Sequence, residues 1–300
     1  MNNVAASIPE SSSFAIASKV KDYFQLMKFT LSFTVVFSCV VSYLLVPGIA
    51  FSFPAVLELF VAGILITGSA NAINQVLERH TDTLMRRTSG RPLAAKRMQP
   101  AEAWTFAVLS GIGGLALMAI WFNTLSAAIA LASLVLYGFI YTPLKKINSI
   151  AVLVGALPGA LPCLTGWAAG AGQLTAPGWV LFGIQFIWQF PHFWAIAWVA
   201  YRDYEKAGFK LLPGREGPTK FSALQCIIYS MLMIPVGMLP YYFHVSGILS
   251  LWILLLCNFS MVILSFRLFV KMTTAAARSV MFGSYFYLVI VFLALLFDKI

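Results

Sequence analysis

Long apolar runs of about 20 residues repeat along nearly the whole chain. A run of this length lets an α-helix cross the hydrocarbon core of a bilayer. Only 10% of the residues are charged, against about 25% in a soluble domain. These features predict an all-α integral membrane protein built as a bundle of about nine transmembrane helices. The runs lie at 29–46, 52–77, 103–121, 124–142, 149–170, 178–200, 222–243, 246–269 and 279–297.

The breaks between these runs contain no linker, low-complexity tract or second soluble domain. We therefore expect residues 29–300 to form a single membrane-embedded domain. Residues 1–28 are expected to form a cytoplasmic tail, in which 14–27 has the character of an amphipathic surface helix. A disordered tail is an equally good interpretation of the first dozen residues. The start of the chain is too polar for a signal peptide and lacks the arginines of a transit peptide, which favours a bacterial plasma membrane.

Basic residues lie before the first apolar run and in every second break after it. In a chain of nine spans, these positions all fall on the same side of the membrane, and only Lys299 is left for the other side. The positive-inside rule therefore predicts a cytoplasmic N-terminus and an external C-terminus. The net charge of +10 follows from this bias. No basic patch interleaved with stacking aromatic residues indicates nucleic-acid binding.

The end of the second apolar run carries polar side chains at four-residue spacing: Asn74, Glu78, Asp82 and Arg86. This spacing places side chains on one face of a helix. Carboxylates so arranged can hold Mg²⁺, which usually shares its ligand shell with substrate phosphates, and Arg86 and Arg87 could bind phosphate oxygens. Ordinary flanking charge is the alternative, but topology alone does not require acidic residues. The pattern predicts a diphosphate site at the cytoplasmic membrane surface.

The loop at 201–214 repeats this combination directly after the sixth apolar run, with Asp203 and Lys206 among its charged residues. Two acidic, basic-flanked helix ends that face each other would hold a diphosphate through bridging metal ions. A soluble diphosphate enzyme would not need nine spans, so we expect the rest of the substrate to be a lipid tail between helices.

His192 lies inside the sixth apolar run. An ionisable residue within a membrane span is a functional hypothesis by default, and imidazole is a common ligand of haem iron. The alternative is a neutral histidine that is hydrogen-bonded inside the bundle.

The segment Asn74-Gln75-x-x-Glu78-x-x-x-Asp82 resembles a variant of the Asn-Asp-x-x-Asp-x-x-x-Asp motif of the UbiA-type intramembrane prenyltransferases. Within that superfamily, further segments are similar to the protohaem IX farnesyltransferase (haem O synthase) family. The superfamily's second motif ends in another Asp where this chain has Ala207, so the second acidic cluster of this chain has fewer candidate metal ligands. The similar segments lie, in the family's order, at 78–93, 141–146, 155–167, 188–194 and 203–213.

This resemblance implies transfer of farnesyl from farnesyl diphosphate to a vinyl group of haem B, giving haem O for a terminal oxidase. It implies that Glu78, Asp82 and Asp203 hold Mg²⁺, with Asn74 at the edge of the ligand. A haem-modifying enzyme or an oxidase assembly factor would be the protein partner. Arg86, Arg87, Lys145, Lys146 and Lys206 would bind the diphosphate, and Tyr141, Trp188 and His192 would lie on the acceptor side.

Two other functions compete with this reading. Prenylation of a quinone precursor or another aromatic acceptor uses the same chemistry. A transporter of an anionic or haem-like solute is a different class, typically with repeated halves and broken helices near the midplane. Here the polar residues gather at the predicted cytoplasmic ends, and nine helices do not divide into equal halves, so the sequence favours the enzyme. A non-catalytic assembly factor would not need stacked carboxylates.

Overall fold

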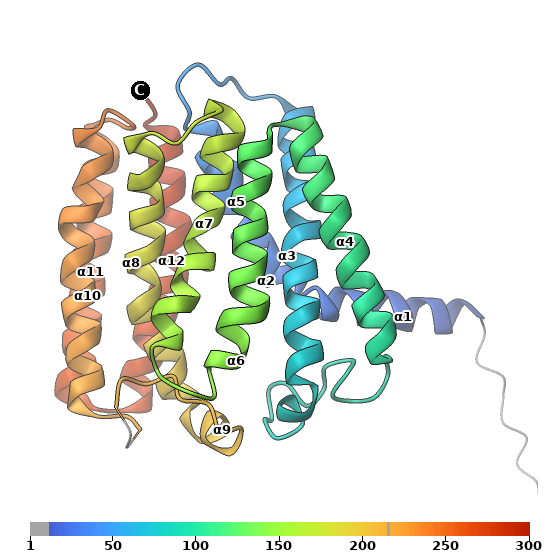
Figure 1. Cartoon of the computed structure of the whole chain (residues 1–300). Helices are drawn as coiled ribbons and strands as arrows, with labels where there is room; N and C mark the ends of the chain where they lie inside the picture. Colours follow the sequence, from blue (N-terminus) through green and yellow to red (C-terminus); the bar gives the residue numbers. More distant parts are fainter. Residues whose placement is uncertain (1–11, 215–216) are drawn as a thin grey trace, which may run out of the picture.

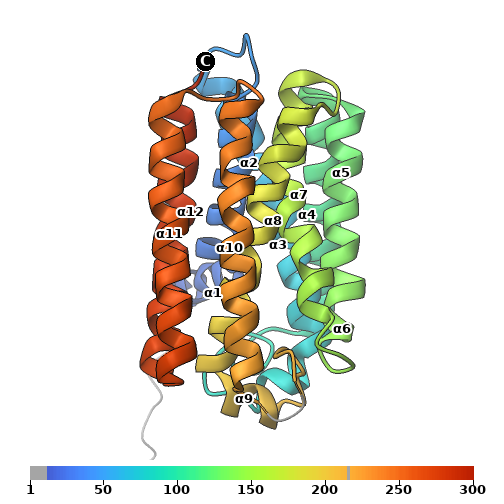
Figure 2. The same ribbon diagram turned by 90° about the vertical axis from the view of Figure 1, so that its left-hand side faces the viewer.

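The computed structural model describes residues 12–214 and 217–300, and every regular element in these two ranges is a helix (Figures 1 and 2). The first eleven residues, and with them most of the predicted disordered tail, lie outside the described residues. The helix α1 (Ser12–Leu26) covers the segment for which a surface helix is predicted, and in Figure 1 it runs across the long axis of the bundle. The chain then bends by 49° into α2 (Phe29–Leu44).

Each predicted apolar run corresponds to a helix or a helix series. Eight helices of the described part are long and apolar enough to cross a membrane, or nine if the bent α1–α2 pair counts as one span. The prediction of an all-α bundle of about nine spans is therefore confirmed. After α2 come α3 (Phe53–Asp82), α4 (Pro100–Trp121), α5 (Thr124–Val135), α7 (Ala151–Ala171), α8 (Ala176–Val199), α10 (Lys220–Tyr242), α11 (Ile248–Lys271) and α12 (Thr274–Phe297).

The fourth apolar run changes its helical geometry near its end. After α5, the six-residue π-helix η1 (Leu136–Tyr141) leads into the short α6 (Thr142–Leu144). Pro143 has no N–H to offer to the preceding turn, which favours such a local rearrangement. The Tyr137 carbonyl accepts from the backbone N–H of Thr142 and, at 2.9 Å, also from its hydroxyl. The widened turn carries Tyr137 and Tyr141, whose ring centroids are 5.5 Å apart.

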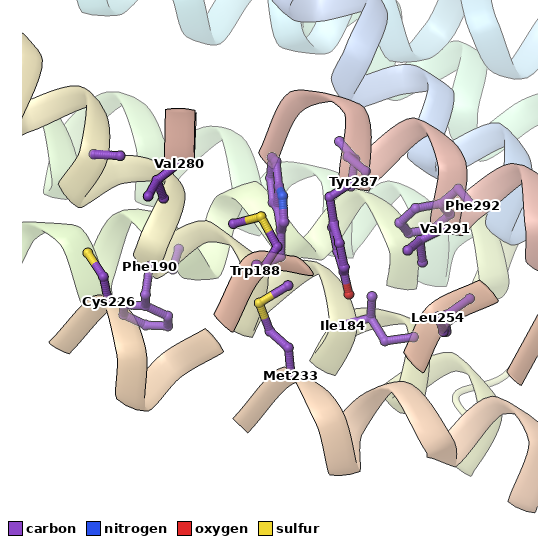
Figure 3. Close-up of a cluster of buried hydrophobic side chains, with 14 of the residues drawn as sticks. Ile184, Trp188, Phe190, Cys226, Met233, Leu254, Val280, Tyr287, Val291 and Phe292 are labelled. Atoms are coloured by element: carbon purple, nitrogen blue, oxygen red, sulfur yellow. The ribbon is translucent and has the colours of Figure 1, made fainter. Parts of the chain in front are cut away.

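Two large buried apolar clusters and one small one lie within the described part of the bundle. One contains residues of α2 to α5, and the larger one joins α8 to α10, α11 and α12. In the larger cluster, Ile184 and Trp188 of α8 lie with Met233 of α10 and Tyr287 of α12 (Figure 3). The larger cluster also includes residues of α2 and α7, so it connects the N-terminal helices with the C-terminal ones.

The two ends of the bundle differ in what they carry. The last turn of α3, α6 and the short helix α9 (Tyr201–Lys206) lie at one end, and the C-terminus lies at the other (Figure 1). At the C-terminal end, the ammonium of Lys299 donates to the carbonyls of Leu44, Val46 and Ile49 at 2.6, 2.8 and 3.0 Å. This contact ties the end of the chain to the end of α2.

Candidate active site

The last turns of α3 form one wall of a cavity of about 420 Å³ at the α9 end of the bundle. Asn74, Glu78 and Asp82 all line it and are only 1%, 4% and 1% exposed. The four-residue spacing brings all three side chains to the same wall because α3 continues to Asp82. The prediction that Arg86 extends this face is wrong, because the helix has ended four residues earlier. Arg86 is exposed and lies outside the lining.

Each polar group of this α3 face is matched by a cation from another segment. The Lys145 ammonium, just after α6, forms a salt bridge with Glu78. Arg91 Nη1 donates to both carboxylate oxygens of Asp82 at 2.8 Å. Lys28, at the bend between α1 and α2, donates from Nζ to Asn74 Oδ1 at 2.7 Å.

The cavity lining has more positive than negative charge. Counted at their ordinary charges, four basic side chains, Lys28, Arg87, Arg91 and Lys145, face two carboxylates, a formal excess of two positive charges. Burial lowers the pKa of Lys145, although the neighbouring Glu78 acts in the opposite direction. Such a lining favours a polyanion whose oxygens can accept several charge-assisted hydrogen bonds.

A second, mainly apolar chamber of about 190 Å³ adjoins this cavity. Gly155 borders the chamber where the Tyr141 ring approaches α7, and a Cβ at Gly155 would lie 2.6 Å from that ring. Trp188 lines the chamber and belongs to the larger core. Together the two spaces suit an amphiphile with an anionic head and an apolar tail. Their shared lining residues are Leu31, Tyr137, Tyr141, His192 and Phe193.

The structure does not bring every predicted binding residue to the cavity. Lys146 and Lys206 are exposed, and Asp203 on α9 is half-buried but does not line the cavity. The next residue, Tyr204, does line it, and its hydroxyl accepts from Arg87 Nη2 at 3.2 Å. Within 12–214 and 217–300, no three His, Cys, Asp or Glu side chains lie close enough together to hold a metal ion.

Several lining residues were not assigned a role from the sequence: Lys28, Arg91, Tyr137 and Tyr204. Arg91 lies nine residues after Asp82 across a segment of turns, so no helical spacing connects the two. Lys28 is distant from the α3 motif along the chain and belongs to the general basic bias. The positive charge of both residues is a sequence signal, and Arg91 has a second one because it lies in the 78–93 segment that is similar to the family.

Comparison with known proteins agrees with this architecture. Residues 35–296 match the UbiA prenyltransferase family. The chain belongs to this family. A protoheme IX farnesyltransferase from Cytophaga hutchinsonii is 44% identical over 286 residues, which cover 95% of this chain and 100% of the relative. The enzyme of that name from Christiangramia forsetii is 39% identical over 94% of this chain and 95% of its own.

Solved structures of UbiA-type proteins share the fold of this prenyltransferase. A digeranylgeranylglyceryl phosphate synthase superposes with a TM-score of 0.75 at 19% identity, over 94% of this chain and 98% of its own. A UbiA homologue from Archaeoglobus fulgidus, bound to GPP and Mg²⁺, gives a TM-score of 0.64 at 16% identity, over 91% and 99%. The chain is thus a multi-pass membrane prenyltransferase.

Proposed function

We propose that this prenyltransferase transfers a farnesyl group from farnesyl diphosphate to a vinyl group of protohaem IX (haem B), giving haem O. The observation that carries the choice of acceptor is the similarity over nearly the whole chain to relatives named protoheme IX farnesyltransferase. The cation-rich cavity beside an apolar chamber supports the choice of donor, because farnesyl diphosphate has an anionic head and an apolar tail.

The diphosphate would lie in the cavity, where Lys28, Arg87, Arg91 and Lys145 can donate to its oxygens. These donors stabilise the charge that develops on the leaving group as the C1–O bond breaks. Arg86, Lys146 and Lys206 lie outside the lining, so the proposal assigns them no contact with the diphosphate.

The carboxylates of Glu78 and Asp82, with the amide oxygen of Asn74, offer hard oxygen donors on one helix face. Mg²⁺ is commonly held by one or two carboxylates together with substrate phosphates, so this donor set fits the ion. Bound Mg²⁺ would supply Lewis-acid stabilisation of the departing diphosphate. Asp203 does not line the cavity, and the proposal therefore rests on the α3 residues.

The tail would lie in the apolar chamber, which places C1 where the two spaces meet. Tyr137 and Tyr141 line both spaces and can stabilise an allylic cation with their ring faces. The apolar surroundings exclude bulk water from that cation. Trp188, Tyr141 and His192 would contact the acceptor on the α8 side.

The cavity lies at the bundle end that carries the basic loops. By the positive-inside rule, we propose that this end faces the cytoplasm of a bacterial cell, with the C-terminus outside. Farnesyl diphosphate would then enter from the cytoplasmic side.

The test is to incubate the purified protein in detergent with haem B, farnesyl diphosphate and Mg²⁺, and to analyse the extracted pigment by mass spectrometry. The expected product is haem heavier by a hydrated farnesyl group, and EDTA should abolish its formation. Unchanged haem, with prenylation of a quinone precursor by the same preparation, would instead support the quinone activity. If neither acceptor is modified, the proposal is refuted.

A further inference from the structure

A hydrogen bond to α12 fixes the tautomer of His192. Its Nδ1 lies 2.8 Å from the hydroxyl oxygen of Ser284, a fully buried residue. That hydroxyl donates its single proton to the Met281 carbonyl at 2.6 Å, so it can only accept from the imidazole. Nδ1 therefore carries the proton, and Nε2 is left with a free lone pair.

The orientation of the ring is fixed as well. Trp188 stacks on the imidazole with ring centroids 4.8 Å apart and an interplanar angle of 18°. The Trp188 indole N–H donates to the Ser284 carbonyl at 2.8 Å, so the indole and the imidazole are both hydrogen-bonded to the same residue of α12. Tyr285 packs edge-on at a centroid distance of 5.0 Å.

His192 lies where the polar cavity and the apolar chamber meet, because it lines both. An amphiphilic prenyl diphosphate changes from polar to apolar at its C1 atom, so C1 belongs at this junction. Of the five residues that line both spaces, His192 is the one with a neutral side-chain nitrogen. The nearby Lys145 and Glu78 are paired with each other.

We propose that His192 Nε2 is the base that accepts a proton when the reaction ends, with Ser284 as the positioning residue that keeps Nε2 unprotonated. This inference rests on the proposed function. In that reaction, the C1–O bond of farnesyl diphosphate breaks and its electron pair leaves with the diphosphate. The vinyl π electrons form the new bond to C1, and a cation remains on the vinyl carbon attached to the porphyrin ring.

A water molecule discharges this second cation. Its oxygen bonds to the cationic carbon, and one of its protons passes to Nε2, which later returns it to solvent. Reacting carbon atoms approach to about 3–3.5 Å, and the second cation is one bond further away. A base at the junction is therefore within reach of the water that attacks it.

The test compares wild type, His192→Asn and Ser284→Ala in detergent, with His80→Gln as the control. The Asn side chain can still donate to Ser284 but has no basic nitrogen. His80 lies on α3, is exposed and does not line either space. For each protein, kcat, the haem affinity and Soret absorption, and the masses of all pigment products are measured.

We expect His192→Asn to lower kcat about 100-fold or more, the usual contribution of a general base. Haem affinity and the Soret band should stay as in wild type, and the remaining product should include prenylated haem that lacks the added water. Ser284→Ala keeps the imidazole and should lower kcat about tenfold in the same direction. His80→Gln should match wild type.

Three results would overturn the inference. His192→Asn could keep at least half of the wild-type kcat and form only hydrated product. It could lose haem affinity and shift the Soret band, which would make His192 an iron ligand or a packing residue. If His192→Asn does not fold, wild-type kcat in Ser284→Ala would exclude the positioning role. Failure of wild type itself to farnesylate haem would refute the proposed function instead.

Discussion

Replacing Lys145 by Met removes the cation that neutralises Glu78 inside the cavity. The two side chains are only 9% and 6% exposed, so little solvent screens the carboxylate that remains. Removing one partner of a buried pair costs about 3–5 kcal/mol. We expect a loss near the lower limit, about 3 kcal/mol, because Lys28 and Arg91 also line this cavity. The Lys145 ammonium also lies 4.9 and 5.2 Å from the ring centroids of Tyr141 and Phe209, so Met, an apolar side chain, removes these cation–π contacts together with the salt bridge.

The double variant Glu78→Gln/Lys145→Met separates the contribution of the pair to stability from its role in the reaction. Replacing both charged residues of a buried pair often changes stability little. The unfolding free energy of the double variant should therefore return to within about 1 kcal/mol of wild type. Turnover should be lost in the single and in the double variant. Lys145→Met removes one hydrogen-bond donor to the diphosphate, and the double variant also removes one carboxylate that would hold Mg²⁺. Unfolding in mixed micelles measures the first quantity, and the haem farnesylation assay measures the second.

Two results would refute this reasoning. A Lys145→Met protein as stable as wild type would show that Glu78 does not depend on this cation. Wild-type turnover in the double variant would remove both residues from the active site.

Three further substitutions test other parts of the structure. Asp82→Asn should lower kcat by about 100-fold or more while the protein still purifies normally, and Glu102→Gln, which breaks an exposed ion pair outside the cavity, should keep wild-type kcat. Gly155→Ala should lower kcat at least about tenfold, because the new Cβ displaces the Tyr141 ring from its position 2.6 Å away; unchanged kinetics would contradict that contact. Lys299→Met should lower the unfolding free energy by about 1.5–3 kcal/mol, because three carbonyls lose a charged donor, with kcat of the folded protein unchanged; equal stability in mixed micelles would contradict it.

The fold could be predicted because the bilayer restricts the choice of structure. Backbone groups without water must bond internally, so each apolar run of sufficient length becomes a helix. Boundaries were less predictable: the apolar run ends at residue 77 and the four-residue spacing continues to Arg86, whereas α3 ends between these positions, at Asp82. The apolar periodicity of the sequence does not predict the change from α5 to a π-helix before Pro143.

The α3 part of the site was predictable for a local reason. Asn74, Glu78 and Asp82 belong to one helix, and a helix converts sequence spacing into spatial order without help from the rest of the chain. Arg86 shows the limit of this rule, because spacing has no meaning beyond the last helical turn. Asp203 remains a predicted metal ligand that no contact in the described structure supports.

The sequence by itself determined that the protein lies in a membrane, how many spans it has, and which face of α3 carries the carboxylate and amide oxygens. Composition and helical spacing are properties of short segments, so the sequence is sufficient for these features. Only the tertiary structure decided which cations contact these α3 oxygens: Lys28, Arg91 and Lys145 come from three separate segments of the chain. It also decided that Ser284 of α12 orients His192 of α8 across 92 residues of chain. Such pairings depend on how helices pack against one another, and neither residue type nor spacing along the chain specifies that packing.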